Sequence, residues 1–214
     1  MYVPAHFKEE RVPVLHDAIR RLGFGTDVTA GAEGLEASHL PLLVDPEPEP
    51  FGTLQGHLAR ANPQWRAMQA GAQALAMFLG PNAYITPSWY PTKRETGKVV
   101  PTWNYLAIHA HGEVRIFDDP ELLRRHVRRL TETHEAARPA PWAVGDAPEG
   151  FIAGMLRGIV GFTMRITRLE GKWKMSQNRP AGDQAGVYEG LTADGGAGHA
   201  AVAGIMATRT KGSA

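Results

Sequence analysis

The residue types best suited to bind a ligand are concentrated in one short segment. Residues 172–179 hold three cations, Lys172, Lys174 and Arg179, together with an indole, a hydroxyl and two side-chain amides. Cations pair with phosphate, while amides and a hydroxyl can hydrogen-bond a planar heterocycle. The segment is therefore a candidate binding site. The alternative is a solvated strand end that carries a structural tryptophan, because clusters of charge are usually solvated.

A second candidate lies where an expected strand, residues 53–59, leads into a helix. Arg60 and Asn62 leave the strand, Asn62 is a good N-cap, and Pro63 suits the first helical position. Backbone N–H groups at a helix N-terminus, together with an arginine, can hold an anion. The alternative is an ordinary N-cap with a surface arginine nearby.

Metal and nucleic-acid sites are less well indicated. His109 and His111 share one face of an expected strand, but no third ligand lies at suitable spacing, so we expect no metal site. The expected helix 119–137 carries four arginines that could line up with phosphates, at positions 124, 125, 128 and 129. Pairs at i,i+4 spacing, Glu121 with Arg125 and Arg128 with Glu132, equally fit a solvated face.

Composition limits the class of protein. The 214 residues are 43% hydrophobic, which suffices for one sizeable core, and the formal net charge of +1 gives no general argument for nucleic-acid or membrane binding. The chain has no cysteine, so disulfides and thiolate chemistry are excluded. Neither a signal peptide nor an apolar run of membrane-spanning length is visible, and we expect a cytoplasmic protein.

The order of the expected elements favours an α+β protein. Residues 24–44 and 74–88 are predicted hairpins, the second turning at Gly80-Pro81-Asn82, and long strands are expected at 99–110 and 159–169. Helices are expected near 10–22 and 119–137. Because strands and helices do not alternate regularly, a mostly antiparallel barrel is favoured over a doubly wound sheet. The Gly/Ala-rich segment 192–214 is expected to be a flexible tail after a domain covering 1–191.

Several ordered blocks of the sequence carry a family resemblance. They include the blocks 1–7, 34–41, 52–65, 80–90, 97–105 and 169–179, which read MYVPAHF, GLEASHLP, GTLQGHLARANPQW, GPNAYITPSWY, GKVVPTWNY and LEGKWKMSQNR. Up to about Leu191 the chain resembles the PaiB family of FMN-binding negative transcriptional regulators. The resemblance implies a split β-barrel with flanking helices, FMN as cofactor, and a homodimer with its cofactor sites at the subunit interface.

The resemblance also implies where FMN is held. Arg60 and Asn62 would hold the phosphate, and the strand around Ser38, His39 and Leu40 would lie along the flavin edge. Trp103 and Asn104 would close the pocket, although a tryptophan in a strand is more often core. The remaining expected contacts would come from the partner subunit: Lys174, Ser176, Gln177 and Arg179.

Three functions remain open at this stage. The first is a flavin-binding negative transcriptional regulator that contacts DNA, and the second is a flavin-dependent oxidoreductase that uses NAD(P)H. The third is a haem-binding protein on the same barrel. No catalytic residue is expected in any case that uses flavin, because a flavin does the redox chemistry itself.

Overall fold

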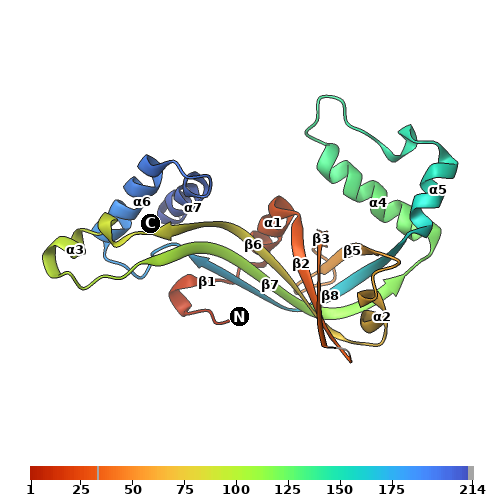
Figure 1. Cartoon of the computed structure of the whole chain (residues 1–214), viewed down its shortest axis with the longest axis horizontal. Helices are drawn as coiled ribbons and strands as arrows, with labels where there is room; N and C mark the ends of the chain where they lie inside the picture. Colours follow the sequence, from red (N-terminus) through yellow and green to blue (C-terminus); the bar gives the residue numbers. More distant parts are fainter. Residues whose placement is uncertain (33, 212–214) are drawn as a thin grey trace. The chain divides into compact units, whose positions relative to one another are not determined.

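An antiparallel sheet with flanking helices forms the fold, as the sequence predicts (Figure 1). The computed structural model describes residues 1–32 and 34–211. Among these residues the sheet has eight strands, and β1 (Lys8–Glu9) pairs with β8. The other strands follow the order β3 (Gly34–Pro41), β2 (Phe24–Gly31), β6 (Gln73–Ile85), β7 (Thr102–Phe117), β8 (Ile159–Lys174), β5 (Thr53–Ala59), β4 (Leu43–Asp45).

The chain forms two compact units, and β6, β7 and β8 contribute residues to both. The terminal unit comprises residues 1–10, 79–108 and 170–214, and the central unit comprises residues 11–78 and 109–169. The helices of the terminal unit are η1 (Ala5–Phe7), η2 (Pro87–Trp89), α3 (Pro91–Thr96), α6 (Ala181–Asp194) and α7 (His199–Lys211). The central unit holds α1 (Val12–Leu22), α2 (Gln64–Gln69), α4 (Pro120–Glu135), η3 (Val144–Asp146) and α5 (Glu149–Arg157).

Local signals set the two longer helices of the central unit. Helix α1 has Pro13 in its first turn and ends at Gly23, whose φ of 64° is left-handed, as expected of a C-terminal glycine. Helix α4 begins after Asp119, whose side chain accepts hydrogen bonds from the N–H groups of Glu121 and Leu122. Both boundaries confirm the sequence prediction.

Strands β2 and β3 form the predicted first hairpin and carry polar residues inward. In their antiparallel register Asp27 lies opposite Ser38, and Thr26 lies opposite His39. Asp27 and Thr29 alternate with more exposed neighbours, and both are buried. Polar side chains on the inner face of a strand need partners, and these partners define a site described below.

The predicted second hairpin is wrong. Residues 73–85 form one continuous strand, β6, through the expected turn at Gly80-Pro81-Asn82. Gly80 is required by close packing, because a Cβ there would lie 3.0 Å from the side chain of Leu106. The glycine that suggested a turn therefore makes room for a neighbouring strand.

The expected flexible tail is also corrected over its described part. Residues 192–194 end α6, and α7 follows at His199–Lys211 with Val202 and Ala203 buried. Within the predicted tail, a Cβ at Gly198 would lie 2.2 Å from the carbonyl oxygen of Asn82. Small residues here permit close helix packing and do not indicate disorder. The last three residues of the predicted tail, 212–214, lie outside the described residues.

In the part of the chain that the structure describes, no helix is long and apolar enough to cross a membrane.

Candidate functional site

The terminal unit contains a small polar pocket of about 40 Å³, here called the cationic pocket. Its lining consists entirely of polar side chains, two of them cations, and no carboxylate is among the described residues that line it. These residues are Thr102, Asn104, Lys174, Ser176, Asn178 and Arg179. Four of them were expected from the sequence to be cofactor contacts, so the structure brings Asn104, Lys174, Ser176 and Arg179 together.

A buried hydrogen-bonded pair forms the floor of the cationic pocket. Asn104 Nδ2 lies 3.0 Å from Ser176 Oγ, and Ser176 Oγ lies 3.1 Å from Asn104 Oδ1. Both residues are buried. Among the described residues, Ser176 alone outside glycine has a positive φ, 66°. Such a backbone is strained for a residue with a side chain, and strain of this kind is concentrated at functional sites.

Lys174 carries the clearest electrostatic signal of this unit. Its ammonium donates hydrogen bonds to the hydroxyl of Thr102 and the carbonyl of Trp103. Burial lowers the pKa of Lys174, and the positive charges of Lys172 and Arg179 lower it further. A bound anion would offset this concentration of positive charge.

Arg179 lies over an aromatic ring. Its guanidinium carbon is 4.8 Å from the centroid of Tyr90, which is buried. Burial raises the pKa of the Tyr90 hydroxyl, and Arg179 opposes that shift. Stacking fixes the guanidinium plane, so Arg179 presents its donors in a defined orientation.

Two residues of the predicted binding segment play different parts. Gln177 bonds locally, because its Nε2 donates to Trp173 O and its Oε1 accepts from the Met175 N–H. Gln177 therefore holds the turn and does not line the cationic pocket. Trp173 is buried, as the structural alternative required. A contact of Gln177 with a cofactor stays a prediction.

Trp103 is not a core residue. It is 52% exposed and makes an edge-to-face contact with Tyr84, their ring centroids 5.9 Å apart. Tyr84 is itself 45% exposed. The core-packing alternative for Trp103 is therefore wrong, and an aromatic pair is available on this surface.

In the central unit, polar side chains expected to hold a cofactor are joined to one another. Gln64 lies at the centre: its Oε1 accepts from Ser38 Oγ, and its Nε2 donates to Thr29 Oγ1 and, at 3.1 Å, to Asp27 O. Asn62 donates to Ser38 at 2.8 Å and accepts from the Gln64 N–H at 3.0 Å. We call this set the Gln64 network. Sequence reasoning brought in Ser38 and Asn62 but missed Gln64.

Asp27 is the most perturbed acid of the Gln64 network. It is fully buried, and its Oδ2 has no hydrogen-bond partner. Desolvation raises the pKa of this carboxyl to about 7. Within the network the group is therefore protonated in mildly acidic solution and about half protonated near pH 7.

Arg60 was predicted to hold a phosphate, but its guanidinium is already bonded internally. Its Nε donates to Arg157 O at 2.9 Å, one Nη donates to Ile159 O at 3.0 Å, and the other lies 3.6 Å from Asp118. These bonds join the end of β5 to the start of β8 and to α5. Phosphate binding by Arg60 stays a prediction, with these internal bonds as competitors.

The two other predicted residues on β3 face opposite ways. His39 is exposed, and its Nδ1 lies 2.9 Å from Thr26 Oγ1. Leu40 is buried, and a Cβ on Gly56 would lie only 2.9 Å from its side chain. Side-chain contact with a flavin is therefore open to His39, while Leu40 packs in the core.

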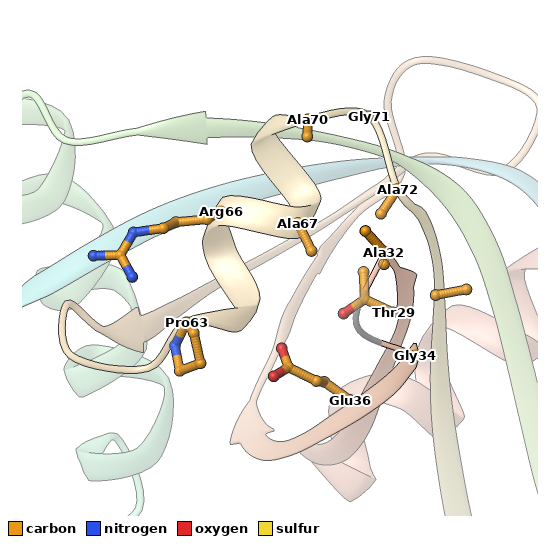
Figure 2. A pocket seen from close by; sticks show the side chains of 12 residues that line it. Thr29, Ala32, Gly34, Glu36, Pro63, Arg66, Ala67, Ala70, Gly71 and Ala72 are labelled. Carbon is orange, nitrogen blue, oxygen red and sulfur yellow. The ribbon is translucent and has the colours of Figure 1, made fainter.

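A larger cavity of about 590 Å³ lies between the β2–β3 turn and α2 (Figure 2). Its walls are mostly alanine and glycine, and no Cβ on Gly34 or Gly71 would meet another atom within 4 Å. Thr29 and Glu36 line it, and each also contacts Gln64, so the Gln64 network borders this cavity. Arg66 is its cation, with the guanidinium 5.0 Å above the Trp65 ring. We call it the small-residue cavity.

A histidine pair lies deeper in the central unit. His57 Nδ1 and His126 Nε2 are 3.0 Å apart, so one nitrogen donates and the other accepts. Burial lowers the pKa of His126 to about 4, with smaller contributions from His57 and Arg129, and burial also lowers the pKa of His57. Both imidazoles are therefore neutral near neutral pH.

Several members of these sites escaped sequence reasoning, among them Asp27, Gln64 and Thr102. Each sits in a strand or a helix start whose polarity looks ordinary in the sequence. The period of two along β2 is the one signal that could have predicted burial of Asp27. Side chains of a strand point alternately to its two faces, so Asp27 shares its face with Gly25 and Thr29.

Comparison with known proteins gives a consistent result. A family described as "Putative FMN-binding domain" matches residues 1–168. A curated Bacillus subtilis protein, "Protease synthase and sporulation protein PAI 2", is 35% identical and covers 89% of each chain. An uncharacterized Aspergillus fumigatus protein is 38% identical over 89% of this chain and 90% of its own.

The solved structures agree on the fold. The FAD and haem binding protein from Mycobacterium smegmatis superposes with a TM-score of 0.58 at 14% identity, covering 78% of this chain and 73% of its own. Together with the observed sheet, this confirms the predicted split barrel. The family match ends before Lys174, so most of the cationic pocket lies beyond the matched residues.

Proposed function

Because this chain belongs to the FMN-binding domain family and its cofactor is FMN, we propose that it acts as an FMN-binding negative transcriptional regulator. The proposal has two parts, a flavin site and a DNA-contacting surface. The Bacillus relative named for protease synthase and sporulation supports a regulatory role.

The residues of the central unit fit a flavin. The small-residue cavity, at about 590 Å³, lies within the range of roughly 300–1,000 Å³ that is usual for ligand pockets. Its alanines and glycines leave room for a flat ring, and the bordering Gln64 network offers hydroxyl and amide groups for a ring edge. Bound there, FMN would supply redox chemistry, and the protein would orient the ring and exclude water.

Helix α4 supports the DNA-binding part. Two of its arginines are held internally, Arg124 by Glu149 and Arg129 by Asp45. Arg125 and Arg128 are exposed, which is the single observation that favours a phosphate-contacting face on this helix. Two cations per chain would contribute modestly to the affinity for DNA, and a dimer would present twice as many.

Gel-shift measurements test this proposal. Duplexes selected from a random pool by the FMN-loaded protein should bind with an affinity that falls as salt rises. Arg125→Glu with Arg128→Glu should weaken binding at least tenfold and lower the salt slope. The matched control is Arg115→Glu, an exposed arginine on β7. Selection that enriches no sequence, or equal binding by all variants, would end the regulatory proposal.

A flavin-dependent oxidoreductase is the second candidate, because the small-residue cavity of about 590 Å³ is large enough to hold a flavin, whose ring can accept and pass on electrons. Anaerobic addition of NADH or NADPH would then bleach the bound FMN, and an acceptor would restore its absorbance. Absence of bleaching by either donor would remove this candidate.

We also propose that the protein is a homodimer. The exposed pair of Tyr84 and Trp103 offers an apolar surface for a second copy of the terminal unit. Light scattering after size-exclusion chromatography should give twice the mass of the chain, and Trp103→Glu should lower it. A monomer in the wild type at micromolar concentration would contradict the proposal.

A further inference from the structure

A further cavity of the central unit, of about 300 Å³, is lined by residues from the end of α1, from β4 and from the C-terminal half of α4. We call it the α1–α4 cavity. It shares no lining residue with the small-residue cavity and contains no member of the Gln64 network. The α1–α4 cavity is therefore a separate place in the fold, and the flavin site does not use it.

The charged groups of the α1–α4 cavity are mostly basic. Its described lining holds Arg20, Arg129 and His134 and one acid, Asp45. Asp45 accepts hydrogen bonds from Arg129 on both carboxylate oxygens, at 2.6 and 3.1 Å, so these two charges offset each other. Among the described residues, the side chains of Arg20 and His134 have no hydrogen-bond or ion-pair partner. The groups still available to a ligand are therefore basic, which favours an acid over an amine.

The floor of the α1–α4 cavity supplies a second, independent observation. Basic residues in the last turn of a helix are common without any ligand, because they offset the partial negative charge of the helix end, and Arg20 and His134 lie in such turns. Leu42, Leu43 and Val44 also line the cavity, and they are only 2% to 8% exposed. An apolar floor beneath exposed basic groups suits a molecule with an apolar body and an anionic group.

Size and donor number narrow the class of ligand. A volume of about 300 Å³ lies at the lower end of the range of roughly 300–1,000 Å³ that is usual for small-molecule pockets. One ring or a short hydrocarbon chain with a carboxylate fits this volume, whereas a dinucleotide does not. A single available guanidinium matches the two oxygens of a carboxylate, while a doubly charged phosphate monoester would need more cations.

We propose that the α1–α4 cavity binds a small monocarboxylic acid with an apolar body. The carboxylate pairs with Arg20, and the apolar body lies on Leu42 and Val44. Thr133 and His134 supply further polar contacts at the rim. None of these residues belongs to the flavin site or to the DNA-contacting face proposed above, so the inference does not rest on the proposed function.

Benzoate is the probe, titrated into the full chain at constant ionic strength, with benzamide as the uncharged analogue and benzylamine as the cationic one. Calorimetry should show benzoate binding at least tenfold more tightly than either analogue. Benzoate should also raise the unfolding temperature of the protein. Titrations with and without saturating FMN should give the same benzoate affinity, because the two sites are separate.

Two variants with matched controls locate the site. Arg20→Met keeps an apolar stem but removes the charge, and it should weaken benzoate at least tenfold. Arg21→Met is its control, because Arg21 is exposed, pairs with Asp17 and does not line the cavity. Thr133→Trp should fill the mouth of the cavity and block benzoate. Its control is Glu132→Trp, an exposed position on the same helix that does not line the cavity.

The proposal is overturned if the wild type binds benzoate no better than benzamide. It is equally overturned if Arg20→Met and Arg21→Met bind benzoate alike, or if Thr133→Trp leaves the affinity unchanged. Loss of benzoate binding on saturation with FMN would place the acid in the flavin site and would also overturn it. Circular dichroism checks the folding of each variant. Failure of FMN or DNA binding would leave the benzoate titrations unaffected, so the proposals fail separately.

Discussion

The two units of this protein treat buried polar groups in opposite ways. In the central unit, the Gln64 network joins hydroxyl, amide and backbone groups to one another, and its one acid, Asp27, stays neutral up to about pH 7. In the terminal unit, the cationic pocket collects charged groups without a carboxylate among its described lining. The first arrangement is nearly complete by itself, whereas the second gains most from a ligand.

This difference gives the two units different expected responses to mutation. Removing a member of the Gln64 network should lower stability, because its partners would remain buried without hydrogen bonds. Changing the cationic pocket should alter ligand affinity with a smaller effect on stability. Four measurements of stability test this comparison.

The largest expected effect is the pH dependence caused by Asp27. Its pKa is about 7 in the folded protein and 3.8 as a free side chain. Below pH 3.8 both states hold the proton. Between pH 3.8 and 7 only the unfolded state releases it, so stability falls as pH rises, by roughly 4 kcal/mol in total.

Asp27→Asn should abolish this part of the pH dependence. Urea unfolding of both proteins at pH 4, 6 and 8 measures it, and the difference between the two proteins removes the contribution of other groups. The free energy of unfolding of the variant should increase relative to that of the wild type as pH rises. A difference that is constant across pH would show that Asp27 ionises normally and that the network is not neutral.

Gln64→Leu should cost roughly 3 kcal/mol. It keeps a side chain of similar length but leaves the hydroxyls of Ser38 and Thr29 and the carbonyl of Asp27 without their shared side-chain partner. Chemical unfolding at pH 6 measures the loss. Gln69→Leu is the control, since Gln69 is exposed on the same helix. Equal losses for the two variants would remove Gln64 from the centre of the network.

The histidine pair should make the central unit sensitive to acid. The pKa of His126 is about 4 in the folded state against 6.5 ordinarily, so the unfolded state takes up a proton first as pH falls. Stability is therefore complete above pH 6.5 and decreases toward pH 4, with a loss of roughly 2 kcal/mol at pH 5.

His126→Leu should reduce the loss of stability between pH 7.5 and pH 5. Chemical unfolding at these two pH values measures the loss for the variant and for the wild type. NMR titration of the wild-type imidazoles gives a direct check. A His126 that titrates near 6.5 in the folded protein would contradict the prediction.

The smallest effect concerns the strained backbone of Ser176. Both Ser176→Ala and Ser176→Gly lose the hydroxyl, but only glycine relieves a φ of 66°. The alanine variant should therefore be less stable than the glycine variant by about 1 kcal/mol. Thermal unfolding compares them. Equal stability of the two variants would contradict the prediction that the backbone of Ser176 is strained.

Part of the molecule followed from local chemistry that the sequence displays. Asp119 with Pro120 began α4, Gly23 ended α1, and the β2–β3 hairpin formed where alternation predicted it. These features depend on interactions between residues only a few positions apart, so they can be predicted from a short stretch of sequence. The candidate binding segment 172–179 could likewise be identified from the sequence, because its cations and amides are close together in the chain itself.

Other features depended on residues far apart in the chain. Gly80 suggested a turn and Gly198 lay in the predicted flexible tail, but the structure uses them for close contact with Leu106 and the backbone of Asn82. Arg60 has the right chemistry for phosphate, but distant carbonyl groups of residues 157 and 159 accept its hydrogen bonds.

The sequence by itself determined many of the helices and strands, the antiparallel α+β class and the residue types suited to a flavin. Tertiary structure alone decided which of those groups are hydrogen-bonded within the protein and which can still bind a ligand. Gln64 meets Thr29 and Ser38, and Asn104 meets Ser176, only after folding. The reason is that hydrogen bonding and burial are properties of neighbours in space, and these neighbours are separated by 26 to 72 positions along the chain.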